Sequence, residues 1–142
     1  MNGNAELLNF VFQNSQMGII TIKQLLDIVT DNNFKSLIKS QLNEYEEINK
    51  NAKQMLSEHG YDEKGINALE KVRTYLMINF QTLGDKTPSH IYEMLIIGSN
   101  MGVINAVKNL KKYANADGDI INLMERLLRF EENNIQELKA YL

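Results

Sequence analysis

Apolar residues recur at steps of three and four positions along almost the whole chain, the spacing that places side chains on one face of an α-helix. This spacing runs through segments with the approximate bounds 4–29, 34–58, 63–83, 88–113 and 120–142. No segment shows the sustained alternation of apolar and polar residues that is typical of a β-strand. The sequence therefore predicts an all-α fold.

Short polar stretches separate the helical segments and supply signals for helix ends. The side chains of Thr30 to Asn33 can accept hydrogen bonds from the free amides at a helix start. Gly60 suits the left-handed position just beyond a helix end. Thr87 followed by Pro88 predicts another helix start, because proline is tolerated in the first helical turn. A tight connection over 114–119 then precedes the last helix.

Two inward-facing rows follow from this spacing. The first helix is expected to bury Leu8, Val11, Ser15, Gly18, Ile22, Leu25 and Val29, with Phe12, Ile19 and Leu26 widening this row. The second is expected to bury Ile38, Leu42, Tyr45, Ile48, Ala52 and Leu56. A glycine in the middle of a helix costs about 1 kcal/mol relative to alanine. Gly18 and its later counterpart Gly102 therefore predict places where two helices approach closely.

The chain also contains an internal repeat. Residues Ser15 to Ile20 align with Ser99 to Ile104 at an offset of 84. At an offset of 85, Leu42, Tyr45, Glu46, Glu47 and Asn49 align with Leu127, Phe130, Glu131, Glu132 and Asn134. The first helix thus matches the fourth, and the second matches the fifth. This order predicts two antiparallel helix hairpins, about 4–59 and 87–142, joined by a crossover helix at about 63–84.

The repeated hairpins resemble the ferritin-like superfamily, which includes rubrerythrins and related bacterial helical bundles. The resemblance implies one ferritin-like antiparallel four-helix bundle over 1–142. In that family a di-metal site takes one Glu from each of two helices and a Glu-x-x-His pair from each of the other two. On this chain the Glu-x-x-His positions hold Glu46 with Asn49, and Glu131 with Asn134. Both histidines are therefore replaced by asparagine.

Further ligands that the resemblance implies are also missing. The single glutamates fall at or next to Ser15 and Ser99, and neither serine can bridge two metal ions. Only Glu46 and Glu131 remain, and two carboxylates do not balance the charge of two iron ions. We therefore expect a bacterial bundle without a cofactor, which acts as a structural or protein-interaction module, spore-coat-like, rather than as an enzyme.

The same residues leave three arrangements open. In one alternative, the protein is a divergent carboxylate metal-binding protein or oxidoreductase that holds iron or manganese through Glu46 and Glu131. Without metal, the residues at the ligand positions are expected to form an interior polar network, because buried polar groups need hydrogen-bond partners. This network would comprise Ser15, Glu46, Asn49, Ser99, Glu131 and Asn134. In the remaining arrangement the glutamates turn to solvent at an edge of the bundle.

Composition narrows the classes of function further. The chain has no cysteine and two histidines, which excludes disulfides and thiolate sites and disfavours most zinc sites. Its net charge of −3 gives no sign of a nucleic-acid surface. The longest uncharged run, Leu7 to Ile22, is too short and too polar to span a bilayer, and no basic residue precedes Lys23 as in a signal peptide. These features predict a cytoplasmic or spore-associated protein without a transmembrane segment.

Self-association or contact with another protein is the expected kind of partnership. Tyr75, Met77 and Phe80 lie on the predicted crossover helix, where they would leave apolar surface uncovered. Uncovered apolar surface is typical of contact sites between proteins. A dimer is one form that this contact would take.

Overall fold

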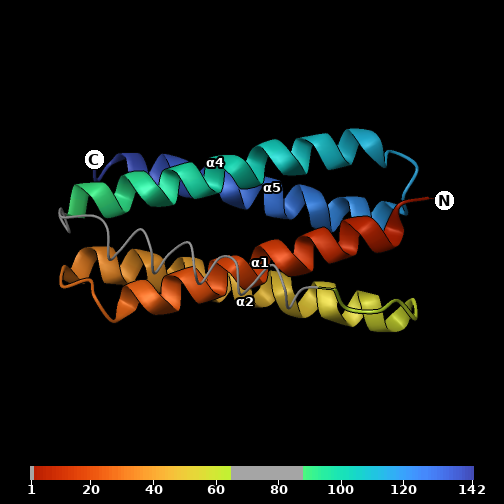
Figure 1. Cartoon of the computed structure of the whole chain (residues 1–142), viewed down its shortest axis with the longest axis horizontal. Coiled ribbons are helices and arrows are strands. Elements are labelled where there is room, and N and C mark those ends of the chain that lie inside the picture. The colour runs from red at the N-terminus through yellow and green to blue at the C-terminus, as the bar shows by residue number, and fades with distance from the viewer. Residues whose placement is uncertain (1, 65–87) are drawn as a thin grey trace. The chain divides into compact units, whose positions relative to one another are not determined.

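The described part of the chain is entirely helical in its regular structure. The computed structural model describes residues 2–64 and 88–142, and in these ranges there are four α-helices and no strand. The helices are α1 (Asn4–Leu26), α2 (Asn32–Glu58), α4 (Pro88–Lys112) and α5 (Gly118–Lys139), as Figure 1 shows. The prediction of an all-α fold is confirmed for these residues.

The predicted crossover helix falls almost entirely outside the described residues. Its first two positions, Glu63 and Lys64, are described and are not helical. Tyr75, Met77 and Phe80, from which self-association was predicted, lie outside the described ranges. The prediction for this segment therefore stays a prediction.

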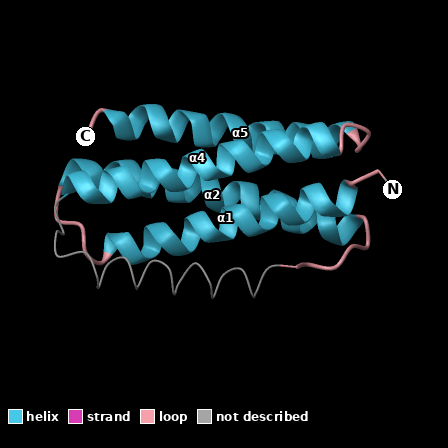
Figure 2. Ribbon diagram, turned by 45° about the horizontal axis from the view of Figure 1, so that its top comes forward, coloured by secondary structure: helices cyan, strands magenta, loops and turns pink. Residues whose placement is uncertain are grey.

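The chain divides into two compact units. One unit is Asn9–Gly84, which contains most of α1 and all of α2, and the other combines Met1–Leu8 with Asp85–Leu142, which contains α4 and α5. Within each unit the two long helices follow one another after a short connection and lie side by side (Figure 2). Each pair is therefore an antiparallel helix hairpin. That the whole chain forms one domain stays a prediction.

Both ends of α2 carry the signals that the sequence predicted. The Asp31 carboxylate accepts hydrogen bonds from the amides of Asn33, at 2.8 Å, and Phe34, at 3.2 Å. At the other end Gly60 has a φ of 70°, and the amide of Tyr61 donates to the carbonyl of Leu56 at 2.9 Å. This positive φ is readily adopted by glycine, which has no Cβ to clash with the backbone.

The inward rows of α1 and α2 are both largely as predicted. The residues predicted for the first row are buried except Gly18, Ile19 and Leu26, which are half-buried. The buried row of α2 is Phe34, Ile38, Gln41, Tyr45, Ile48, Ala52 and Leu56. Leu42, predicted to face inward, is half-buried, and its neighbour Gln41 is buried instead. Adjacent residues are separated by about 100° around a helix, so at this one turn α2 buries the position next to the predicted one.

The two helices of the second hairpin differ in how well their apolar residues are covered. The buried residues of α5 are Ile120, Leu123, Met124, Leu127, Glu131, Asn134, Ile135 and Leu138. In contrast, α4 leaves several large apolar side chains on the surface, among them Ile97, Met101 and Ile104. Among the described helices, none is long and apolar enough to cross a membrane.

Candidate functional site

A hydrogen-bonded pair of side chains joins α1 to α2 at two of the predicted network positions. Asn49 on α2 donates from Nδ2 to the Ser15 hydroxyl at 3.1 Å and to the Phe12 carbonyl at 3.2 Å. The fully buried Ser15 hydroxyl in turn donates to the Val11 carbonyl of its own helix at 2.7 Å. The pair satisfies polar groups that would otherwise be costly to bury between two helices.

The equivalent residues of the second hairpin are arranged differently. Asn134 on α5 is only 2% exposed, and its Nδ2 has no hydrogen-bond partner among the described residues. Ser99, the counterpart of Ser15 on α4, is half-buried. A buried amide nitrogen without a partner costs about 1–3 kcal/mol. The repeated asparagines thus share a sequence context but not a set of contacts.

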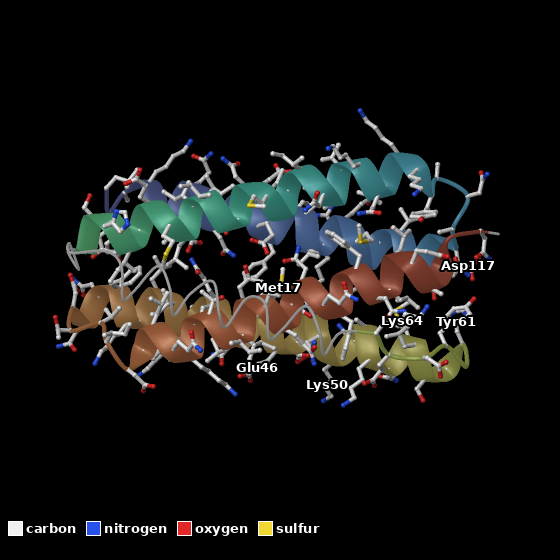
Figure 3. All side chains as sticks on the ribbon, in the orientation of Figure 1. Met17, Glu46, Lys50, Tyr61, Lys64 and Asp117 are labelled. Carbon is white, nitrogen blue, oxygen red and sulfur yellow. The ribbon has the colours of Figure 1, made fainter. Side chains whose placement is uncertain are left out.

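The two glutamates at the predicted ligand positions lie in opposite environments. Glu131 on α5 is 2% exposed, in agreement with the predicted interior position. Glu46 is exposed, and Figure 3 shows it with Lys50 on the outer side of α2. The prediction that Glu46 faces the interior is therefore wrong.

The position of Glu46 follows from the packing of its neighbour Tyr45. A Cβ atom on Gly18 of α1 would lie 2.6 Å from two ring atoms of Tyr45, so the ring occupies the space that glycine leaves. Burying an aromatic ring is favourable, whereas burying a carboxylate is costly. Tyr45 therefore takes the inward position, and Glu46, the next residue, turns outward. The close approach predicted for Gly18 is confirmed.

The burial patterns of α2 and α5 explain why the internal repeat wrongly predicted an interior position for Glu46. Buried residues recur with the same spacing along α2 and α5. In this pattern Tyr45 of α2 corresponds to Glu131 of α5. When the buried residues of α2 and α5 are aligned, Tyr45 matches Glu131, so the offset between the helices is 86 residues. Aligned by sequence similarity, they are offset by 85. One residue of difference moves a side chain to another face.

Two polar residues that the sequence did not single out hold the segment after α2. Asn9 donates from Nδ2 to the Asp62 carbonyl at 3.2 Å and accepts from the Lys64 amide at 2.8 Å. Gln13, one turn later on α1, donates to the Lys64 carbonyl. Figure 3 labels Lys64 near the end of this segment. An asparagine within the otherwise apolar run from Leu7 to Val11 was the signal available in the sequence.

Within residues 2–64 and 88–142, no group of three or more His, Cys, Asp or Glu side chains is placed to hold a metal ion. Asn49, at a position where the resemblance implies histidine, is already bonded to protein oxygen atoms. In the described structure Asn49 and Ser15 join α1 to α2.

The clearest surface feature is an apolar strip along α4. Ile97, Met101 and Ile104 are 52%, 60% and 53% exposed. Their spacing places them on successive turns of the same side of the helix.

Comparison of the chain with family models, curated proteins and solved structures gives no match.

Proposed function

We propose that the protein is a structural or protein-interaction module that makes contact through the exposed apolar strip of α4. The observation that carries this proposal is the exposure of Ile97, Met101 and Ile104, each more than half accessible. Isolated apolar residues are common on protein surfaces and need no explanation. A contiguous row on one helical face is instead typical of a surface that another protein covers.

Comparison of the two repeats supports this assignment. Met17 and Ile20 on α1 are the counterparts of Met101 and Ile104, and both are half-buried. The same residue types are exposed on α4. Apolar residues in the second repeat are thus available for a role beyond the packing of their own hairpin.

Two observations on the first hairpin support a function that does not depend on a resident metal. The exposed Glu46 carboxylate lies on the outer side of α2, and the Asn49 amide nitrogen donates to Ser15 and Phe12. The first hairpin therefore uses these ligand positions for solvation and helix packing. Membership of the ferritin-like superfamily is part of the same proposal and is supported by the repeated hairpins. The cytoplasmic or spore-associated setting stays a prediction.

Photo-crosslinking in the organism that carries the gene would test the proposed contact surface. A photoreactive amino acid at Met101 is expected to give covalent adducts with protein. The same group at Arg129, an exposed position on α5, serves as the control and is expected to give few. Equal labelling at both positions, or none at either, would contradict the proposal.

Elemental analysis tests the proposed independence from metal. After expression in iron- and manganese-supplemented medium and purification without chelator, the protein is expected to contain neither metal in stoichiometric amount. Stoichiometric metal that is lost in a Glu131→Ala variant would instead establish the carboxylate metal-binding alternative. A Glu132→Ala variant, altered at an exposed neighbour, is the matched control.

A further inference from the structure

The exposed strip of α4 continues into a charged residue at each end. Along one side of the helix the order is Glu93, Ile97, Met101, Ile104 and Lys108, and all five are exposed. We call these five residues the α4 face. Successive members are three or four positions apart, so they share one side of the helix. The α4 face is therefore acidic at one end, apolar in the middle and basic at the other.

This order makes the α4 face complementary to itself when two copies run in opposite directions. Read backwards, the face presents Lys108, Ile104, Met101, Ile97 and Glu93. An antiparallel pair thus places Glu93 of each copy opposite Lys108 of the other, and Ile97 opposite Ile104. Met101 then lies beside the two-fold axis. A parallel pair would instead place like charges opposite each other, which is unfavourable.

The surroundings of the α4 face are compatible with close approach of a second helix. Gly98 is exposed beside Ile97, and a Cβ atom added to it would meet nothing within 4 Å. Asn100 and Asn105 flank the apolar residues and are also exposed, as expected for a polar rim. Glu93 lies 3.9 Å from the His90 ring nitrogen, but its side chain remains 63% exposed and available to a partner.

We infer that the occupant of the α4 face is a second copy of this chain, bound antiparallel about a two-fold axis. This inference rests on the proposed function and adds the identity of the partner. A two-fold contact uses the same surface on both subunits, and the reversed charge order of the α4 face satisfies that condition. A single helical face is at the small end of protein interfaces, so the dimer is a weak one.

Sedimentation equilibrium of the full chain, over concentrations up to about 1 mM at low salt, tests the inference. The protein is expected to show a monomer–dimer equilibrium, and Met101→Lys is expected to weaken it at least about tenfold by placing two like charges near the axis. Circular dichroism checks that each variant retains its helix content. A protein that stays monomeric over this range would overturn the inference.

Charge exchange tests the antiparallel arrangement. Glu93→Lys and Lys108→Glu, made singly, each place like charges opposite one another twice per dimer and are expected to weaken association about three- to tenfold. The double variant exchanges both charges and is expected to restore the wild-type dissociation constant. Glu132→Lys, at an exposed site on α5, is the control and should leave it unchanged. Dimers that respond to Met101→Lys but not to the single charge changes would overturn the antiparallel arrangement.

The outcomes separate this inference from the proposed function. If the purified chain is monomeric while Met101 crosslinks to a different protein in cells, the α4 face is a contact surface but its occupant is not a second copy. If the chain dimerises and none of the α4 variants affects the dimer, the inference is wrong. If the chain is monomeric and Met101 gives no adducts, both proposals are wrong.

Discussion

Asn49 and Asn134 occupy equivalent places in the repeated sequence but have different contacts. Asn49 donates to the Ser15 hydroxyl and the Phe12 carbonyl, whereas the Nδ2 of the buried Asn134 has no partner in the described ranges. The stability contribution of an amide depends on whether its polar atoms are satisfied once it is buried. The two residues therefore form an internal comparison of a bonded and an unbonded asparagine.

Replacement of both asparagines by leucine tests this difference. Asn49→Leu is expected to lower the free energy of unfolding by about 1–2 kcal/mol, because the bonds to Ser15 and Phe12 are lost. Asn134→Leu is expected to leave it unchanged or to raise it by up to about 1 kcal/mol, because a buried unsatisfied group is removed. Urea unfolding followed by circular dichroism measures both. Equal losses in the two variants would show that Asn134 has partners like those of Asn49.

At the scale of elements, the helix starts differ in how they are capped. Asp31 accepts hydrogen bonds from two amides at the start of α2. Asp117 is the corresponding residue of α5, but its side chain makes no capping bond. The two helices thus begin after the same residue type with different local contacts.

The capping difference predicts unequal costs for the same substitution. Asp31→Ala is expected to lower the free energy of unfolding by about 1 kcal/mol, because two helix amides lose their acceptor. Asp117→Ala is expected to cost less, since only a favourable charge near the helix N-terminus is removed, worth about 0.3–1 kcal/mol. Thermal and urea unfolding of the two variants give the comparison. A larger loss for Asp117→Ala than for Asp31→Ala would contradict it.

The ends of α2 and the helical spacing could be predicted from sequence because they depend on local chemistry. Asp31 and Gly60 act through hydrogen bonds and backbone angles within a few residues of themselves. The inward row of α1 could also be predicted, since its apolar residues leave one choice of face. In α2 one turn offered two neighbouring positions for the buried row, Leu42 and Gln41. Helical periodicity alone does not choose between rows that differ by one residue.

At the scale of the whole molecule, the chain start is held by a residue far away in sequence. Asn4 is buried, and its side-chain oxygen accepts a hydrogen bond from the Asp117 amide at 2.9 Å. Gly3 has a φ of 82°, and a Cβ atom there would lie within 2.5 Å of the Tyr113 side chain. These contacts place the start of α1 in the same unit as α4 and α5.

Removal of the Asn4 side chain tests this long-range contact. Asn4→Ala is expected to lower the free energy of unfolding by about 1–2 kcal/mol, because the Asp117 amide loses its acceptor. Faster hydrogen exchange is also expected in the first turn of α1. Asn109→Ala, whose side chain bonds within α4, is the control and should change neither quantity appreciably. Unaltered exchange in Asn4→Ala would show that the contact does not hold the chain start.

The four described helices, both ends of α2, the repeat and most of the inward row of α1 could be predicted from the amino-acid sequence, because each depends on spacing or on contacts between near neighbours. The outward position of Glu46, the burial of Glu131 and the exposure of Ile97, Met101 and Ile104 on α4 depend on packing between helices and became visible in the folded chain. The face that a helix buries depends on what packs against it, as the Tyr45 ring against Gly18 shows. That partner lies on another helix, so the local pattern around Glu46 does not contain it.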